Sequence, residues 1–217
     1  MKICLLLFFH FSDILKTENS YKNIIYKIKK EVKIMKAAEF IVEGFEQIEA
    51  LTTVDLLRRA GITVDTISVF DEKNVKSSHN VIIETDKNMK DIDFDDYDML
   101  ILPGGPGTGN YEKSDLLLEK LLDFSKNNNK YIGAICAAPG VLARLGILKD
   151  KKAVSFPGVE SDLEKNGAVL LRENVVTDGK ITTSRGAGTA VDFSLRLIEV
   201  LKGKDEADRI AEQIVYK

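Results

Sequence analysis

The chain has 217 residues, of which 44% are hydrophobic and 30% are charged, and its formal net charge is −3. This length suits one well-filled domain and excludes two large ones, and the charge gives no electrostatic reason to expect nucleic acid as a partner. Because Cys4 and Cys136 are the only cysteines and form no disulfide framework, we expect a reducing compartment, the cytoplasm.

The first 34 residues differ in charge from the rest of the chain. They contain seven Lys and three acidic residues, a net charge of +4 against −3 for the whole chain, so residues 35–217 carry −7. The hydrophobic run at 3–11 is too short to cross a bilayer, which takes ~20 apolar residues, and it lacks the cleavage site of a signal peptide. We therefore expect no membrane association and a domain boundary near Met35. We interpret residues 1–34 as a basic extension that precedes the true start of the protein at Met35, rather than as a loosely attached Lys-rich helix. A mature N-terminus near residue 1 would contradict this interpretation.

From Met35 onward, strand and helix patterns alternate along the chain. Strands are predicted at 38–42, 63–70, 97–102, 131–135 and 152–156. Helices are predicted at 45–60, 116–124, 160–166 and 189–201, with a helix directly behind Cys136 and a short helical tail. A hairpin is expected within 75–85, and a second one turns at Asp178-Gly179 between 175 and 184.

This alternation predicts an α/β fold with a parallel sheet that helices cover on both faces. Such sheets place their functional sites beyond the carboxyl ends of the strands. Three groups of residues follow predicted strand ends and should meet at one edge: Gly44 with Glu46 and Glu49, Gly104-Gly105, and Cys136. Their convergence predicts an enzyme site.

Cys136 stands between an apolar strand and a helix, in a one-residue elbow. Pro139 is tolerated in a first helical turn, so the sulfur should lie at a helix N-terminus. Unpaired amides there favour the thiolate and lower a cysteine pKa from about 8.5 into a range of roughly 3.5–7.5. We therefore expect a nucleophilic sulfur at neutral pH, and the alternative is a small buried hydrophobic residue.

Glu49 is the candidate general acid and base. Glu43 and Glu46 precede it at three-residue spacing and are interpreted as a solvated helix start that the helix dipole favours. The neighbours of Glu49, which are Ile48, Ala50 and Leu51, are apolar and favour an inward orientation, although the sequence alone does not decide between inward and outward. If it is buried beside the sulfur, its pKa should be raised and it could donate a proton to the thiolate.

Backbone amides of Gly105 and Ala137, with Gly104 in the same turn, are candidates for an oxyanion site. A plain glycine turn is the alternative. His79 is the only histidine outside the first 34 residues, and we expect it at the surface of the first hairpin. No spacing typical of a metal site is present, nor any phosphate-binding or dinucleotide motif.

At these residues the sequence resembles the ThiJ/PfpI superfamily, within it the branch of the Parkinson-disease-associated protein deglycase. The resemblance runs in order over nearly all of residues 35–217. The matching segments are Gly44-Phe45-Glu46-Gln47-Ile48-Glu49-Ala50, Leu57-Arg58-Arg59-Ala60-Gly61-Ile62, Leu102-Pro103-Gly104-Gly105, Ala134-Ile135-Cys136-Ala137-Ala138-Pro139 and Thr183-Ser184-Arg185-Gly186-Ala187-Gly188-Thr189.

The resemblance implies a flavodoxin-like three-layer sandwich of the class I glutamine amidotransferase type, usually a homodimer. It further implies a nucleophilic cysteine at Cys136, a protonated glutamate at Glu49 and an amide pocket at Gly105 and Ala137. The implied activity is cofactor-free conversion of methylglyoxal or glyoxal to hydroxy acids, or removal of their early adducts from protein side chains. The alternative within the family is a redox sensor and chaperone whose cysteine is oxidised to sulfinate.

The chain departs from the family pattern at Phe156, where members often carry a histidine before the proline. Peptidase-like members have a histidine directly after the cysteine, where this chain has Ala137, so peptidase activity is not expected. Without the histidine at 156, proton transfer must rely on Glu49 and water, and slower turnover is expected. A third reading, an inert interaction domain, would require an unreactive cysteine.

Overall fold

The computed structural model describes residues 34–216, and Met35–Lys217 form one compact unit. The expected basic extension, with Cys4, lies outside the described residues except for Ile34.

The centre of the unit is a seven-stranded sheet with the order β10-β11-β7-β6-β1-β2-β5. All neighbouring strands in it are parallel except β10 and β11, which form an antiparallel hairpin. Its strands are β1 (Lys36–Ile41), β2 (Thr63–Ser68), β5 (Lys87–Asn88), β6 (Met99–Leu102), β7 (Tyr131–Ile135), β10 (Val175–Asp178) and β11 (Ile181–Ser184). The prediction of a mostly parallel sheet is therefore confirmed.

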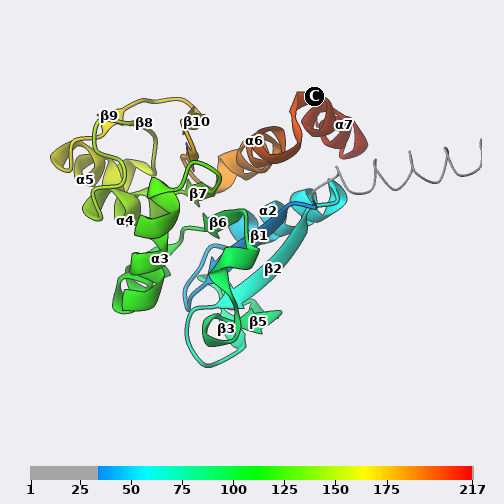
Figure 1. Ribbon diagram of the computed structural model, residues 1–217, viewed down its shortest axis with the longest axis horizontal. Helices are drawn as coiled ribbons and strands as arrows, with labels where there is room; N and C mark the ends of the chain where they lie inside the picture. The colour runs from blue at the N-terminus through cyan, green and yellow to red at the C-terminus, as the bar shows by residue number, and fades with distance from the viewer. Residues whose placement is uncertain (1–33, 217) are drawn as a thin grey trace, which may run out of the picture. The chain divides into compact units, whose positions relative to one another are not determined.

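Helices cover both faces of this sheet (Figure 1). One face carries α2 (Gln47–Arg59), α6 (Ala190–Lys202) and α7 (Lys204–Gln213), and the other carries α3 (Asp115–Lys126), α4 (Ala138–Arg144) and α5 (Glu160–Lys165). Short 3-10 segments connect the elements: η1 (Met89–Asp91), η2 (Phe94–Asp96), η3 (Pro106–Lys113), η4 (Pro157–Val159) and η5 (Ala187–Thr189). The result is the expected three-layer sandwich.

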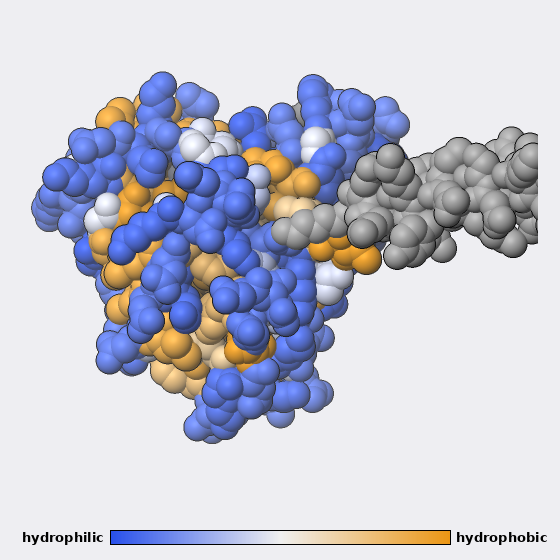
Figure 2. All heavy atoms as spheres, viewed as in Figure 1, coloured by the Kyte–Doolittle hydropathy of each residue, from blue (hydrophilic) through white to orange (hydrophobic). Residues whose placement is uncertain are grey.

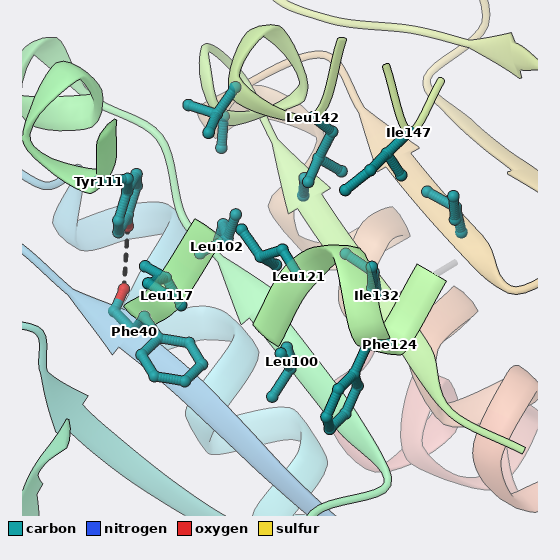
Figure 3. Close-up of a cluster of buried hydrophobic side chains, with 14 of the residues drawn as sticks. Phe40, Leu100, Leu102, Tyr111, Leu117, Leu121, Phe124, Ile132, Leu142 and Ile147 are labelled. Atoms are coloured by element: carbon teal, nitrogen blue, oxygen red, sulfur yellow. Dashed lines mark hydrogen bonds between the residues drawn. The ribbon is translucent and has the colours of Figure 1, made fainter. Parts of the chain in front are cut away.

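Each helical layer buries its own apolar stripe against the sheet. On the α3 face, Leu117, Leu121 and Phe124 pack on alternate residues of β1, β6 and β7 (Figure 3). On the opposite face, the apolar residues of α2 and α6 pack on the intervening residues of the same strands. In Figure 3 the buried phenol of Tyr111, from η3, points at the main chain of Phe40 in β1 and donates a hydrogen bond of 2.9 Å to its carbonyl.

The smaller elements follow the expectations in part. The hairpin within 75–85 is β3 (Asn74–Lys76) and β4 (Ile82–Glu84), and the turn between β10 and β11 places Gly179 at φ +62°. The strand predicted at 152–156 is shorter: β8 (Lys152–Ala153) pairs with β9 (Val169–Leu170) in a separate two-stranded sheet. It ends at Ala153 because the next amide, Val154 N–H, donates to Thr183 Oγ1 at 3.0 Å, and Phe156-Pro157 then turns the chain into η4.

No helix among residues 34–216 is both long and apolar enough to cross a membrane. Figure 2 shows one face of the molecule, on which hydrophilic side chains predominate and hydrophobic ones surface in separate patches.

Candidate functional site

The candidate site lies at the carboxyl ends of four adjacent strands. Arg185, Cys136 and Gly104 directly follow β11, β7 and β6, and Glu49 lies in the first turn of α2, which follows β1. These four strands are neighbours in the sheet. The chain passes from β1 to β2 on one side and returns to β6 on the other, so β1 and β6 flank the point where the strand order reverses. Open α/β sheets form their binding crevices at such points.

Cys136 occupies the predicted elbow between β7 and α4. Its φ is +64°, a conformation that costs a non-glycine residue roughly 1–2 kcal/mol. Hydrogen bonds on both sides hold it there: its N–H donates to the Ser184 carbonyl at 2.9 Å, and its own carbonyl accepts from the Phe156 N–H at 2.8 Å. Strain held in this way is typical of functional positions.

Glu49 faces inward and is fully buried in the first turn of α2. Its Oε2 accepts a hydrogen bond of 2.7 Å from the Gly104 N–H, across the gap between β1 and β6. Its Oε1 is buried without a hydrogen-bond partner of ordinary geometry among the described residues, and the Cys136 thiol lies close enough to lower the carboxyl pKa. The inward orientation, one of two left open by the sequence, is therefore the one observed.

The two groups titrate as a pair. Burial raises the pKa of Glu49 to about 7, which agrees with the expected direction. Burial, together with the Glu49 carboxyl, also raises the pKa of Cys136 to about 12, so the expected lowering of the thiol pKa is wrong. Helix α4 is only seven residues long, and its dipole does not overcome desolvation and the neighbouring carboxylate. Between about pH 7 and 12 the pair holds one proton and one negative charge.

The amides of Gly105 and Ala137 are both directed at the Cys136 sulfur, where their hydrogen bonds oppose the rise in its pKa. Gly104 differs, because its N–H is used by Glu49. Its position excludes any side chain: a Cβ there would lie 2.5 Å from the Cys136 Cβ and 2.7 Å from Glu49 Oε2. The glycine pair therefore contributes one amide to each member of the Cys136–Glu49 pair.

A cavity of about 680 Å³ opens over the sulfur. Glu46, Glu49, Cys136, Arg185 and Thr189 bring polar side chains to its wall. The remaining lining is apolar or glycine: Gly105, Pro106, Ala137, Phe156, Pro157, Gly186, Ala187 and Gly188.

Two acidic residues and the histidine complete the surroundings. Glu46, expected in solvent, instead caps α2 through the Ile48 N–H and lines the cavity, whereas Glu43 is exposed as expected. His79 lies on the exposed β3–β4 hairpin, 2.9 Å from Ser78 Oγ, and does not line the cavity.

Sequence reasoning missed part of the cavity wall. Arg185, Gly186, Ala187 and Thr189 were recognised only as parts of a matching segment, although they follow the end of β11 and could have been assigned to the site on that ground. Phe156 was noted only for the histidine it replaces, yet its side chain forms part of the wall.

Comparison with known proteins places the chain. Protein dj-1beta of Drosophila melanogaster is 35% identical over 179 residues, which span 82% of this chain and 96% of the relative. The glutathione-independent glyoxalase DJR-1.2 of Caenorhabditis elegans is 32% identical over 172 residues, 79% of this chain and 91% of the relative. The structure of oxidized Toxoplasma gondii DJ-1 superposes with a TM-score of 0.79 at 35% identity, covering 84% of this chain and 98% of that one. These neighbours confirm the flavodoxin-like fold.

The DJ-1/PfpI family itself matches residues 35–200, a range that contains every residue of the site described above. The chain therefore belongs to the DJ-1/PfpI family.

Proposed function

We propose that the protein is a cofactor-free, cysteine-dependent glyoxalase that converts methylglyoxal or glyoxal to the corresponding hydroxy acid. The observation that carries the proposal is the buried Glu49 carboxyl against the Cys136 sulfur, with the Gly105 and Ala137 amides directed at the same atom. Relatives at about a third identity that are named glutathione-independent glyoxalases support it. The same pair would also serve a protein deglycase acting on early adducts of these aldehydes.

With the pKa of Glu49 at about 7 and that of Cys136 at about 12, the pair's single proton rests on sulfur. The reactive form arises when this proton moves to the carboxyl and leaves the charge on sulfur. Since Glu49 Oε2 accepts from Gly104, the proton occupies Oε1, the oxygen without another partner among the described residues. The amides of Gly105 and Ala137 lower the cost of this proton transfer, because their hydrogen bonds stabilise the thiolate. After the transfer Cys136 acts as nucleophile and Glu49 as general acid.

The reaction needs only water in addition to the aldehyde. The thiolate adds to the aldehyde carbon, a C–S bond forms, and the carbonyl electron pair moves to oxygen, which takes the proton from Glu49. The Glu49 carboxylate then removes the hydrogen of that carbon as a proton and returns it to the neighbouring carbonyl carbon. The proton of the hemithioacetal hydroxyl moves to the neighbouring carbonyl oxygen, so the hemithioacetal becomes a thioester of a 2-hydroxy acid. Water hydrolyses the thioester and releases lactate or glycolate, and the Gly105 and Ala137 amides stabilise the oxyanions along the way.

Chromatography of the hydroxy acid formed from methylglyoxal tests the proposal. Cys136→Ala should abolish the product, and Glu49→Gln should lower kcat by about 10²–10⁴, the usual contribution of a general acid or base. Glu164→Gln, which changes an exposed carboxyl on α5 away from the cavity, is the matched control and should leave the rate unchanged. Absence of product from the wild-type protein would refute the enzyme and favour the sensor, in which peroxide converts Cys136 to sulfinate.

We further propose a cytoplasmic homodimer that associates through α2 and the β3–β4 hairpin. Ile48 on α2 is 52% exposed and Ile82 on β4 is 65% exposed, and Ser78 of the hairpin donates a 2.9 Å hydrogen bond to Glu46 at the start of α2. Sedimentation velocity should give twice the chain mass. Ile48→Lys combined with Ile82→Lys should give the monomer, whereas Leu116→Lys, on the distant α3, should not.

A further inference from the structure

We propose that the cavity selects 2-oxoaldehydes with an aromatic or branched apolar substituent, and that Phe156 determines this specificity. The inference rests on the proposed function and deepens it, because it names the substrate class.

The size and composition of the cavity favour a substrate larger than methylglyoxal. Its volume of about 680 Å³ falls within the range of roughly 300–1,000 Å³ that is typical of pockets for drug-sized ligands. Glyoxal and methylglyoxal carry only a hydrogen or a methyl group beside their two carbonyls. Glu46, Arg185 and Thr189 contribute polar side chains to the wall, and Phe156, Pro106, Pro157 and Ala187 give it an apolar part that matches an apolar substituent.

Phe156 lies within reach of a substrate bound to the sulfur. A methyl group placed on Gly186 would be 3.7 Å from Phe156 Cδ2 and 3.9 Å from Cys136 Sγ. A single carbon can therefore contact the ring and the sulfur at the same time. When the aldehyde carbon bonds to Sγ, a substituent on the neighbouring carbon can contact the Phe156 ring.

Hydrogen bonds of the main chain fix the position of Phe156 relative to Cys136. Its N–H donates to the Cys136 carbonyl at 2.8 Å, and its carbonyl accepts from the Val159 N–H at 3.0 Å and from Ser155 Oγ at 3.2 Å. Phe156 is nevertheless 49% exposed as a residue, so an aromatic substrate would cover apolar surface that now faces water. Because its backbone is already fixed, Phe156 loses little conformational freedom when a substrate covers its ring, which suits a residue that determines specificity.

The experiment compares kcat/KM for glyoxal, methylglyoxal and phenylglyoxal, with glycolate, lactate and mandelate as the measured products. We expect the wild-type protein to prefer phenylglyoxal over methylglyoxal by at least about tenfold, since even one methylene in an apolar pocket is worth about 10–200-fold. Phe156→Ala should remove most of this preference, by raising the KM for phenylglyoxal more than the KM for methylglyoxal. Leu116→Ala, which truncates an exposed apolar residue on α3, is the control.

Gly186→Ala provides an independent second variant. Its φ of 160° is open to any residue, and the added methyl would make only ordinary contacts. It should fill the space between the ring and the sulfur and penalise phenylglyoxal more than glyoxal. Gly109→Ala, where a Cβ meets nothing within 4 Å, is its control.

Alkylation of Cys136 separates failure of this inference from failure of the proposed function. Mass spectrometry of the Cys136 peptide gives the alkylation rate with N-phenylmaleimide relative to that with N-methylmaleimide. This ratio is divided by the same ratio measured for glutathione. The resulting value should exceed one in the wild-type protein and fall in Phe156→Ala. If no aldehyde is turned over but this ratio behaves as expected, the glyoxalase proposal fails and the apolar specificity stands. A wild-type preference for methylglyoxal, or an equal loss for all substrates in Phe156→Ala, would overturn the inference.

Discussion

The pairing of Cys136 with Glu49 could be predicted from the sequence, but the charge state of the pair could not. Both residues follow strand ends, and parallel strands bring their carboxyl ends to one edge. The elbow is likewise local, because an apolar run stops at Cys136 and a helix begins behind it. The thiol pKa instead depends on burial and on a carboxyl 87 positions earlier in the chain, whose inward orientation is fixed by Gly104. A local helix-dipole argument therefore gave the wrong direction.

The titration of this pair predicts the pH dependence of the proposed reaction. The reactive form has lost one of two protons, and burial places the pKa of Glu49, the first group to lose its proton, at about 7. We expect kcat/KM for methylglyoxal to rise roughly tenfold per pH unit below this midpoint and to level off above it. Glu46→Gln should move the midpoint to lower pH, because the Glu46 charge raises the Glu49 pKa. A profile that stays flat from pH 5 to 9 would contradict this assignment.

Gly104 predicts a steric effect at the same site. Gly104→Ala would place a Cβ 2.7 Å from Glu49 Oε2 and 2.9 Å from the Ile135 carbonyl, and neither of these buried neighbours has room to move. Overpacking of this kind typically costs about 1–3 kcal/mol, and urea unfolding should show the loss as a lower midpoint with an unchanged slope. Gly109→Ala, in open space, should stay within about 0.5 kcal/mol of the wild type; equal effects in both variants would refute the steric argument.

At the scale of elements, the long helices and buried strands could be predicted because their apolar periodicity is strong. The very short strands β5, β8 and β9 have only two residues each, and no period can be read from so few positions. Their pairing is decided by tertiary contacts that the local pattern does not contain. Predicted and observed ends of the longer elements differ by a few residues, as in α2, which begins at Gln47 rather than Phe45.

Strand β1 contains an acidic residue that the proposed mechanism does not use. Glu39 lies in the middle of β1, fully buried, and neither carboxyl oxygen has a hydrogen-bond partner among the described residues. Burial raises its pKa well above the ordinary 4.5, against the opposing charge of Arg58. The folded protein therefore keeps this carboxyl protonated where the unfolded chain releases the proton.

This difference predicts a pH-dependent stability. Above pH 4.5 the unfolded chain binds fewer protons than the folded one at this position, so stability is full below that pH and is lost as pH rises toward the folded-state pKa. Glu39→Leu should remove this contribution and, at pH 8, raise the free energy of unfolding by about 1–3 kcal/mol, the cost of a buried unpaired polar group. Urea denaturation at pH 5 and pH 8 measures it, with the exposed Glu84→Leu as control. The same loss between the two pH values in wild type and Glu39→Leu would contradict the prediction.

For the whole molecule, the layered architecture could be predicted but the order of strands could not. Alternating strands and helices imply a covered parallel sheet, yet several orders are compatible with that pattern. The observed order puts β6 beside β1 although β2 and three short strands lie between them in the chain. That neighbourhood, decided by long-range packing, is what brings the Gly104-Gly105 turn to Glu49 and makes one site from two distant segments.

In addition to their parallel ladder, these two strands are bridged by one buried side chain. The buried Tyr111 hydroxyl lies 2.9 Å from the Phe40 carbonyl on β1 and 3.0 Å from the Pro103 carbonyl at the end of β6. Its one proton is therefore shared between carbonyls that belong to the two halves of the sheet. Separating the halves would take this hydroxyl away from one of the two buried carbonyls, so local opening there is expected to be cooperative.

Deuterium uptake should show that cooperativity. The Glu46 amide bonds to the Gly104 carbonyl at 2.9 Å, and the Gly104 amide bonds to Glu49 at 2.7 Å, so these two amides should exchange together and slowly. Tyr111→Phe should accelerate both by the same factor and leave the remote amide of Leu197 in α6 unchanged; unequal acceleration would contradict a shared opening. The two segments that supply the proposed acid and its glycine turn would then open and close together. The distance between the reacting groups would therefore stay the same while the surrounding surface fluctuates.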